Sequence, residues 1–133
     1  MRYTPDNIQS LAHNEVFVFG SNLAGRHGGG AARLAAEKFG ATFGVGVCHE
    51  GRAYALPTKD EKIQTLPLSE IEKYVGNFIV YAAAHPELTF LVTQIGCGLA
   101  GYTPAEIAPL FFNFAMPRNV VLPEVFWKEG MGE

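Results

Sequence analysis

Two glycine-rich segments hold the residue types best suited to binding or chemistry. The first, GSNLAGRHGGGAA, covers residues 20–32, and the second, IGCGLAGY, covers residues 95–102. Each follows an apolar run and leads toward a segment of helical composition. Backbone N–H groups in such loops and at helix starts bind anions. Ligands of alternating strand–helix proteins bind beyond the carboxyl ends of the strands, so we predict that the two segments form one ligand site.

The glycines of the first segment favour binding of a diphosphate. Gly28, Gly29 and Gly30 permit backbone conformations that a Cβ would forbid, and they can direct successive N–H groups at one anion. A tight or flexible turn is the alternative interpretation. The spacing matches neither the dinucleotide-binding fingerprint nor the P-loop, so neither of those sites is predicted.

Four polar residues accompany these glycines, namely Ser21, Asn22, Arg26 and His27. Asn22 directly follows the apolar run, where it can hydrogen-bond a ribose hydroxyl or instead cap the turn through its own backbone. Arg26 can pair with a phosphate, and His27 can do the same or act as an acid or base. The alternative for both is a solvated loop position.

The second segment is expected to contact the other side of the same ligand. Cys97 could act as a nucleophile, but no base partner is identifiable, and a small buried apolar role is the alternative. Tyr102 can stack on a ribose or base, or pack as an ordinary aromatic residue. The ligand-binding residues predicted here are Gly96, Cys97, Gly98, Leu99, Ala100, Gly101 and Tyr102.

Strands and helices alternate along the chain, which predicts an α/β fold: a mixed central sheet with helices on both faces. Strands are predicted at residues 15–20, 52–56, 88–95 and 119–122, and residues 42–47 are predicted to form a weak strand or an irregular segment. Pro57 is expected to stop the second of these. The polar connection that follows contains Lys59 and Asp60, either of which can reach a cleft.

Three helices are predicted, and the longest covers residues 69–84, with Ser69 and Glu72 as a capping box. Another covers residues 30–39 and ends at Gly40. The third begins with a second capping box at Thr103-Pro104-Ala105-Glu106 and should kink or restart at Pro109. The aromatic residues of the tail, at 126 and 127, are expected to pack back or to mediate self-association.

The composition predicts one ordinary globular domain spanning residues 1–133. The chain has 48% hydrophobic and 17% charged residues and a net charge of −3. The sequence contains no stripe of basic residues, so a dedicated nucleic-acid surface is not predicted. No apolar run approaches the length of a membrane-spanning helix. Cys48 and Cys97 are expected to be free thiols in a reducing cytoplasm, with a single disulfide between them as the alternative, and the scattered histidines predict no metal site. The first residues do not resemble a signal peptide.

Taken together, these features resemble the macrodomain family of ADP-ribose-binding modules, including small macrodomain-like proteins of bacteria and phages. The resemblance rests on Ser21-Asn22-Leu23, on Gly28-Gly29-Gly30-Ala31-Ala32 and on Ile95-Gly96-Cys97-Gly98-Leu99, in the family's order, and it spans about residues 14–122. It implies a three-layer α/β/α fold and a small-molecule ligand, ADP-ribose or a related nucleotide diphosphate. It also implies an ADP-ribosylated protein as a partner, and no cofactor.

Thr58-Lys59 and the second segment look most like the macrodomain branch that removes ADP-ribose from glutamate side chains. In that branch a lysine and an aspartate carry the chemistry, and Lys59 matches the lysine. Ala100 stands where the aspartate is expected, and a methyl group cannot do acid–base or nucleophilic work. The candidate catalytic residues are therefore Lys59, Asp60 as a substitute carboxylate, and Asn22 as a residue that positions water.

Two further functions remain open from the sequence. Phe19-Gly20-Ser21 is similar to the first strand end of nucleotide phosphoribohydrolases, whose later catalytic glutamate motif has no counterpart here. A non-catalytic sensor of NAD-derived metabolites is the other alternative, and Ala100 favours it. In macrodomains an acidic residue early in the chain often binds the adenine amino group, and both Asp6 and Glu15 are candidates.

Overall fold

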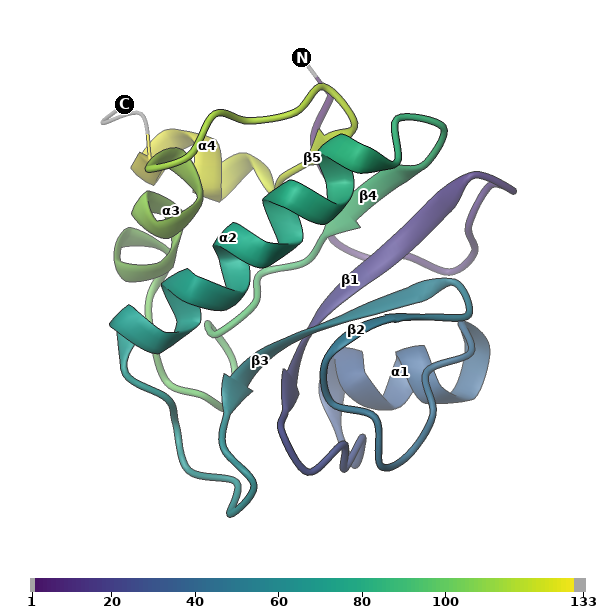
Figure 1. Ribbon diagram of the computed structural model, residues 1–133, viewed down its shortest axis with the longest axis vertical. Coiled ribbons are helices and arrows are strands. Elements are labelled where there is room, and N and C mark those ends of the chain that lie inside the picture. The colour runs from purple at the N-terminus through teal and green to yellow at the C-terminus, as the bar shows by residue number, and fades with distance from the viewer. Residues whose placement is uncertain (1, 131–133) are drawn as a thin grey trace.

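The computed structural model describes residues 2–130, which form a mixed five-stranded sheet and four helices (Figure 1). The strands lie in the order β2-β3-β1-β4-β5. Four of them are mutually parallel, and β2 runs antiparallel to β3 at one edge. The strands are β1 (Glu15–Asn22), β2 (Cys48–Glu50), β3 (Ala53–Lys59), β4 (Thr89–Val92) and β5 (Val120–Val121). The predicted α/β class and mixed sheet are confirmed.

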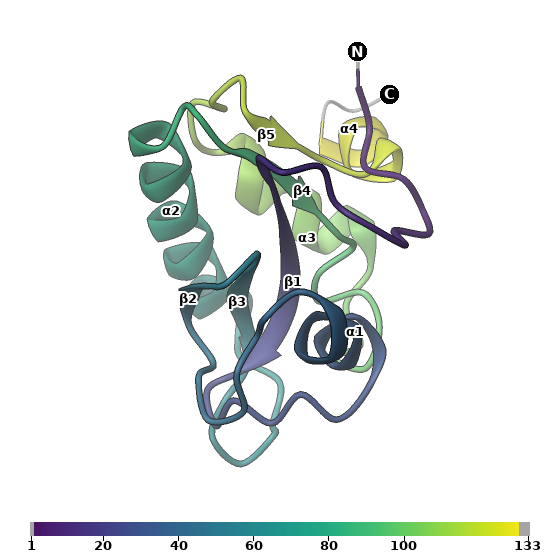
Figure 2. The same ribbon diagram turned by 90° about the vertical axis from the view of Figure 1, so that its right-hand side faces the viewer.

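Helices cover both faces of this sheet, and alternation along β1 explains why. Val16 and Val18 point to one face and Phe17 and Phe19 to the other, and all four are buried. The helices are α1 (Gly30–Lys38), α2 (Leu68–Ala84), α3 (Pro104–Phe112) and α4 (Glu124–Gly130). The valine face packs against α2, α3 and α4, and the phenylalanine face packs against α1. Figure 2 shows α1 and α2 on opposite sides of β1 and β3.

For residues 42–47, the irregular alternative is confirmed and the weak strand is wrong. Residues 42–47 form a turn and an irregular stretch, and the strand β2 begins only at Cys48. Gly44 has a φ of +91°, a left-handed conformation that interrupts extended backbone. This turn packs behind the loop that follows β1, where Gly44 N donates to Gly25 O at 3.0 Å.

Pro57 does not stop β3, contrary to the prediction. The strand continues through Pro57, which lies beside Ser21 of β1, and ends at Lys59. The antiparallel partner β2 pairs with β3 only as far as Ala55. At Pro57 that side of β3 is therefore a sheet edge, where the missing N–H breaks no ladder hydrogen bond. Lys59 thereby becomes a strand-end residue beside the first glycine segment.

The two predicted capping boxes have opposite outcomes. Thr103 and Glu106 form theirs at the start of α3, and Pro109 lies inside this helix without dividing it. At α2 the cap residue is Pro67, no side chain caps the helix, and the predicted box is wrong. The carboxylate of Glu72 instead accepts a hydrogen bond from Asn113 Nδ2 at 2.7 Å, because α3 packs nearby.

The structure also gives the boundaries of the other predicted helices and strands. Gly40 follows α1 with a φ of +82°, as its predicted capping role requires. Phe126 lies fully buried on α4, a helix that the sequence did not predict. The strand predicted for residues 88–95 ends at Val92, so residues 93–95 belong to the loop that follows β4. None of the helices in residues 2–130 has the length and hydropathy needed to cross a membrane.

Candidate ligand-binding cleft

A cavity of about 440 Å³ lies where the chain leaves β1, β3 and β4. Both glycine segments line it, as the sequence predicted. We call residues 23–30 the first glycine loop and residues 95–102 the second. The volume of the cavity lies in the range of small-molecule binding sites. The lining residues are Gly20, Ser21, Asn22, Arg26, Gly28, Gly29, Gly30, Ala31, Ala32, Thr58, Lys59, Ile63, Thr93, Gln94, Ile95, Gly96, Gly98, Leu99 and Ala100.

The first glycine loop presents a run of unbonded N–H groups to this cavity. Within residues 2–130, the consecutive N–H groups from Gly28 to Ala32 have no hydrogen-bond acceptor. The last three belong to the first turn of α1, where a helix leaves its donors unpaired and its dipole is positive. Gly30 has a φ of +56°, which turns the chain into the helix. Unpaired donors at a helix start are suited to an anion, and the prediction of anion binding by this glycine run stays a prediction.

The second glycine loop faces the first with a similar arrangement. Among residues 2–130 the N–H groups of Gly96, Gly98, Leu99 and Ala100 have no acceptor. A Cβ added at Gly96 would lie 2.8 Å from Ile107 Cδ1, and its φ is +74°, so only glycine fits there. The side chain of Leu99 is 82% exposed and reaches to the first loop at Gly29. Unbonded backbone donors therefore flank the cavity on two sides.

The polar side chains after β1 shape the loop more than they reach outward. Asn22 lines the cavity, but its Nδ2 donates to Arg26 O at 2.8 Å and its Oδ1 accepts from Arg26 N at 2.9 Å. That is the turn-capping alternative. Ser21 donates from Oγ to Gly46 O at 2.5 Å, so its hydroxyl is also committed. Arg26 is exposed, lines the cavity and makes no ion pair within residues 2–130.

Outside the second glycine loop, two predicted site residues, His27 and Asp60, do not line the cavity and have structural roles instead. His27 is only 1% exposed, beneath the first glycine loop, with Nε2 3.0 Å from Thr42 O. Asp60 accepts backbone N–H bonds from Lys62 at 2.8 Å and Gln64 at 3.0 Å, which stabilises the turn after β3. Neither side chain lines the cavity. The prediction that Asp60 substitutes for the missing aspartate has no geometric support.

Lys59 reaches the cavity from the end of β3, as predicted. Its neighbour Thr58 is buried and lines the same cavity, and Thr58 Oγ1 lies 3.3 Å from Ser21 O. Lys59 and Arg26 are the only ionisable residues among those that line the cavity in the described part of the chain. The cavity is therefore electropositive, which suits an anionic ligand.

Three predicted ligand residues of the second loop do not line the cavity: Cys97, Gly101 and Tyr102. Cys97 packs against the core, where burial, with a smaller contribution from Glu106, raises the pKa of its thiol to about 11. A protonated thiol is a poor nucleophile at neutral pH. Tyr102 donates its hydroxyl to Leu66 O at 2.7 Å and packs as an ordinary aromatic residue.

Ile63, Thr93 and Gln94 also line the cavity and were not predicted from the sequence. Thr93 and Gln94 were assigned to a strand, which in fact ends before them. Ile63 has a φ of +63°, an unfavourable conformation for a β-branched side chain, in the turn after β3. Left-handed conformations of non-glycine residues concentrate at functional sites. No pattern in the local sequence marks this position.

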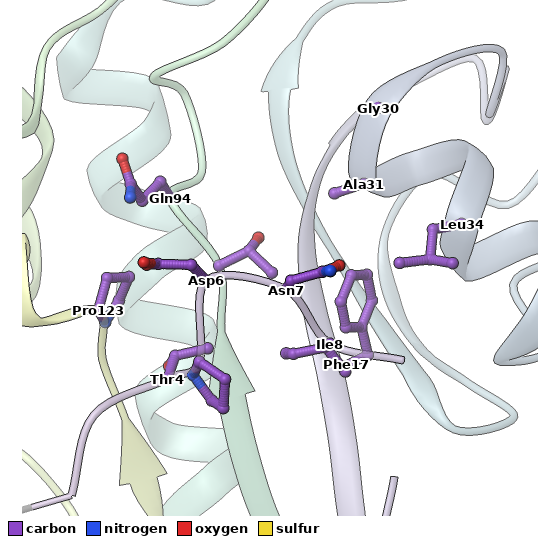
Figure 3. Close-up of a pocket in the computed structure, with 12 residues that line it drawn as sticks. Thr4, Asp6, Asn7, Ile8, Phe17, Gly30, Ala31, Leu34, Gln94 and Pro123 are labelled. Carbon is purple, nitrogen blue, oxygen red and sulfur yellow. The ribbon is translucent and has the colours of Figure 1, made fainter. Parts of the chain in front are cut away.

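A second cavity of about 290 Å³ adjoins the first, and both are lined by Gly30, Ala31, Thr93 and Gln94. Figure 3 shows Asp6 and Gln94 on one side of it, opposite Ala31 and Leu34 of α1. Ile8 and Phe17 add apolar surface. The two cavities together make one cleft with a charged carboxylate at one end and cations at the other.

Of the two acidic candidates for this end of the cleft, only Asp6 lines it. Glu15 instead pairs with Arg2 at 2.5 Å and accepts a hydrogen bond from Ala12 N at 2.8 Å. The hydrogen bond from Arg2, together with that from Ala12, lowers the pKa of Glu15. Glu15 therefore has a structural role at the beginning of β1.

Comparison with protein-family models, with curated proteins and with solved structures finds no match for this chain. Function is therefore inferred from the cleft itself.

Proposed function

We propose that this protein binds ADP-ribose or a related adenosine diphosphate derivative in the cleft. The observation that carries the proposal is the pair of opposed glycine loops, whose unbonded N–H groups line one cavity. Arg26 and Lys59 add positive charge on the same surface. Backbone donors and fixed cations of this kind compensate the two charges of a diphosphate without cost for reorganisation.

The adjoining cavity suits an adenine base. A base is flat and largely apolar, which matches Ile8, Phe17 and Leu34, and its amino group needs an acceptor, which Asp6 supplies. In a nucleoside diphosphate the ribose lies between the base and the phosphates. In the cleft, Asp6 and the glycine loops likewise lie at opposite ends. The resemblance of the sequence to macrodomains agrees with this placement of base and diphosphate. As part of the same proposal, we infer that the fold is the three-layer α/β/α arrangement of that family.

We propose binding, rather than hydrolysis, as the main activity. No carboxylate, imidazole or thiol lines the larger cavity in residues 2–130, and the Asn22 amide is bonded to the backbone of Arg26. Lys59 alone remains as a candidate catalytic group. The proposed ligand is therefore either a free metabolite or the ADP-ribose group of a modified protein.

Isothermal titration calorimetry with ADP-ribose at neutral pH tests the proposal. We expect a single site with a dissociation constant in the micromolar range, since a small charged ligand meets preformed donors. ADP should bind more weakly, because it lacks the distal ribose, and adenosine weaker still, because it lacks the diphosphate. No heat at millimolar ADP-ribose would exclude the proposed function.

A turnover assay distinguishes binding from the alternatives that the sequence left open. Release of ADP-ribose from a glutamate-modified protein, abolished in Lys59→Ala, would indicate a hydrolase. Release of free base from a nucleoside monophosphate would indicate a phosphoribohydrolase. We expect neither product.

The role of Asp6 predicts base selectivity. Asp6→Asn keeps the size of the side chain but replaces a charged acceptor, so we expect ADP-ribose affinity to fall by about tenfold, consistent with loss of a charge-assisted hydrogen bond. Affinity for the analogue with unsubstituted purine as its base, which carries hydrogen in place of the amino group, should change little. Calorimetry with both ligands measures this, and Glu15→Gln is the matched control that should leave both affinities unaltered. Equal losses for the two ligands would contradict the assignment.

A further inference from the structure

The two cavities of the cleft meet at four residues, Gly30, Ala31, Thr93 and Gln94, which line both of them. The proposed function places the adenine base in the smaller cavity and the diphosphate in the larger one. The adenosine ribose joins the base to the phosphates, so it must lie where the two cavities meet. The side chains at this junction therefore decide how the ribose is recognised.

Gln94 has the polar side chain at this junction that is left for a ligand. Gly30 and Ala31 carry no polar side-chain atom, and the hydroxyl of Thr93 already donates its proton to Val18 O at 2.8 Å. Gln94 is exposed, and its side-chain amide makes no hydrogen bond within residues 2–130. The amide combines two N–H donors with a carbonyl acceptor, so it can bond a hydroxyl group in either direction.

The backbone around Gln94 is fixed although its side chain is exposed. Thr93 N donates to Val18 O at 3.1 Å, and Gln94 O accepts from Cys97 N at 3.2 Å. A third cavity of about 370 Å³ adjoins the smaller one, and Gln94 lines all three. Figure 3 shows its side chain on the Asp6 side of the smaller cavity. The amide is therefore held at the meeting point of the cavities while its polar atoms stay open to a ligand.

We propose that Gln94 determines specificity for ribose: its amide hydrogen-bonds the 2′- and 3′-hydroxyls of the adenosine ribose. The protein then distinguishes a ribonucleotide ligand from one that lacks these hydroxyls. The inference rests on the proposed function, which places the base and the diphosphate on either side of Gln94. An N–H group of the amide donates to one hydroxyl oxygen, and the carbonyl oxygen accepts from the other hydroxyl. The preference is moderate, because water can replace the lost partner of an exposed amide.

Calorimetry with two ligands tests this inference. One ligand is ADP-ribose, and the other is its analogue in which the adenosine ribose lacks both the 2′- and the 3′-hydroxyl. The base, the diphosphate and the distal ribose are the same in both, so the ratio of the two dissociation constants reports the adenosine hydroxyls alone. Wild type should bind the analogue about tenfold more weakly, the size expected from two hydrogen bonds to an exposed neutral group.

Two variants connect this preference to Gln94. Gln94→Leu keeps a side chain of similar size without donor or acceptor, so it should bind ADP-ribose and the analogue within about twofold of each other. Gln64→Leu makes the same change at an exposed position in the turn after β3, which lines none of the three cavities, and should keep the wild-type preference. Gln94→Ala removes the amide without adding an apolar side chain and should lose the preference as Gln94→Leu does.

The outcomes separate this inference from the proposed function. If wild type binds ADP-ribose and the analogue equally well, the inference is wrong and the proposed function stands. If Gln94→Leu and Gln94→Ala retain the wild-type preference, another group recognises the ribose and the inference is again wrong. A preference that both Gln94 variants lose and Gln64→Leu keeps supports it, because a general effect on the fold would weaken both ligands alike. If ADP-ribose does not bind at all, the proposed function and this inference fail together.

Discussion

The Gly29→Glu variant is expected to lose ADP-ribose binding by more than a hundredfold while remaining folded. Gly29 lies at the N-terminal cap of α1 with a φ of −159°, extended backbone that any residue adopts. A Cβ there would meet only Leu99 Cδ1, at 3.9 Å, so a side chain fits. Its carboxylate would project among the donors for the diphosphate. Two like charges about 4 Å apart repel by about 4 kcal/mol at an effective dielectric constant near 20.

Two control variants separate charge from bulk and from general effects. Gly29→Ala adds a methyl group without charge and should bind within a few-fold of wild type. Val80→Glu places the same carboxylate at a position 71% exposed on α2, away from the cleft, and should bind as wild type does. Calorimetry with ADP-ribose measures all three. Affinity retained by Gly29→Glu would show that the diphosphate binds elsewhere.

The Gly46→Ala variant is expected to lower the free energy of unfolding by about 3 kcal/mol, at the upper end of overpacking costs. The added Cβ would overlap Asn22 O and lie 3.0 Å from Leu23 Cα, both backbone atoms that no side-chain rotation can move away. Gly46 O also accepts the hydrogen bond from Ser21 Oγ. Relief therefore requires movement of the first glycine loop, so ADP-ribose affinity should fall as well.

Urea denaturation measures the free energy of unfolding of Gly46→Ala, and Gly28→Ala is the matched control. A Cβ at Gly28 has no atom within 4 Å, and Gly28 does not lie in the left-handed region. The same methyl group should there change stability by no more than about 0.5 kcal/mol. Equal stability of the two variants would mean that the 42–46 turn does not pack behind the loop.

The sequence alone predicted the fold class and the local elements that carry the site. Continuous apolar runs at Phe17 and Leu91 indicated buried parallel strands, and the 3.6-residue repeat from Ile71 to Ala82 indicated α2. These patterns depend on which side chains must be buried, and burial is a property of composition and spacing. The position of the two glycine loops beyond the strand ends followed from the same reasoning.

Strand ends were less predictable because they depend on neighbours. Pro57 breaks a strand in isolation, but β3 passes through it where β2 no longer pairs. Ser69 has the residue type of a helix cap, yet α2 begins at Leu68 and Glu72 bonds with Asn113 instead. A local sequence signal determines where a helix or strand ends only when no residue from elsewhere in the fold competes for the same backbone or side-chain group.

The glycine loops themselves were determined by the sequence, since glycine adopts the left-handed backbone of Gly30 and Gly96 without strain and leaves room for Ile107 at Gly96. The orientation of the side chains between them was decided by the tertiary structure. His27 and Arg26 are adjacent in sequence and equally polar, yet one is buried against Phe19 and the other lines the cleft. The difference arises because the 42–46 turn offers two carbonyl acceptors, Thr42 O and Val45 O, to the Nε2 of His27. Distant backbone therefore selects which polar residue holds the loop and which faces a ligand.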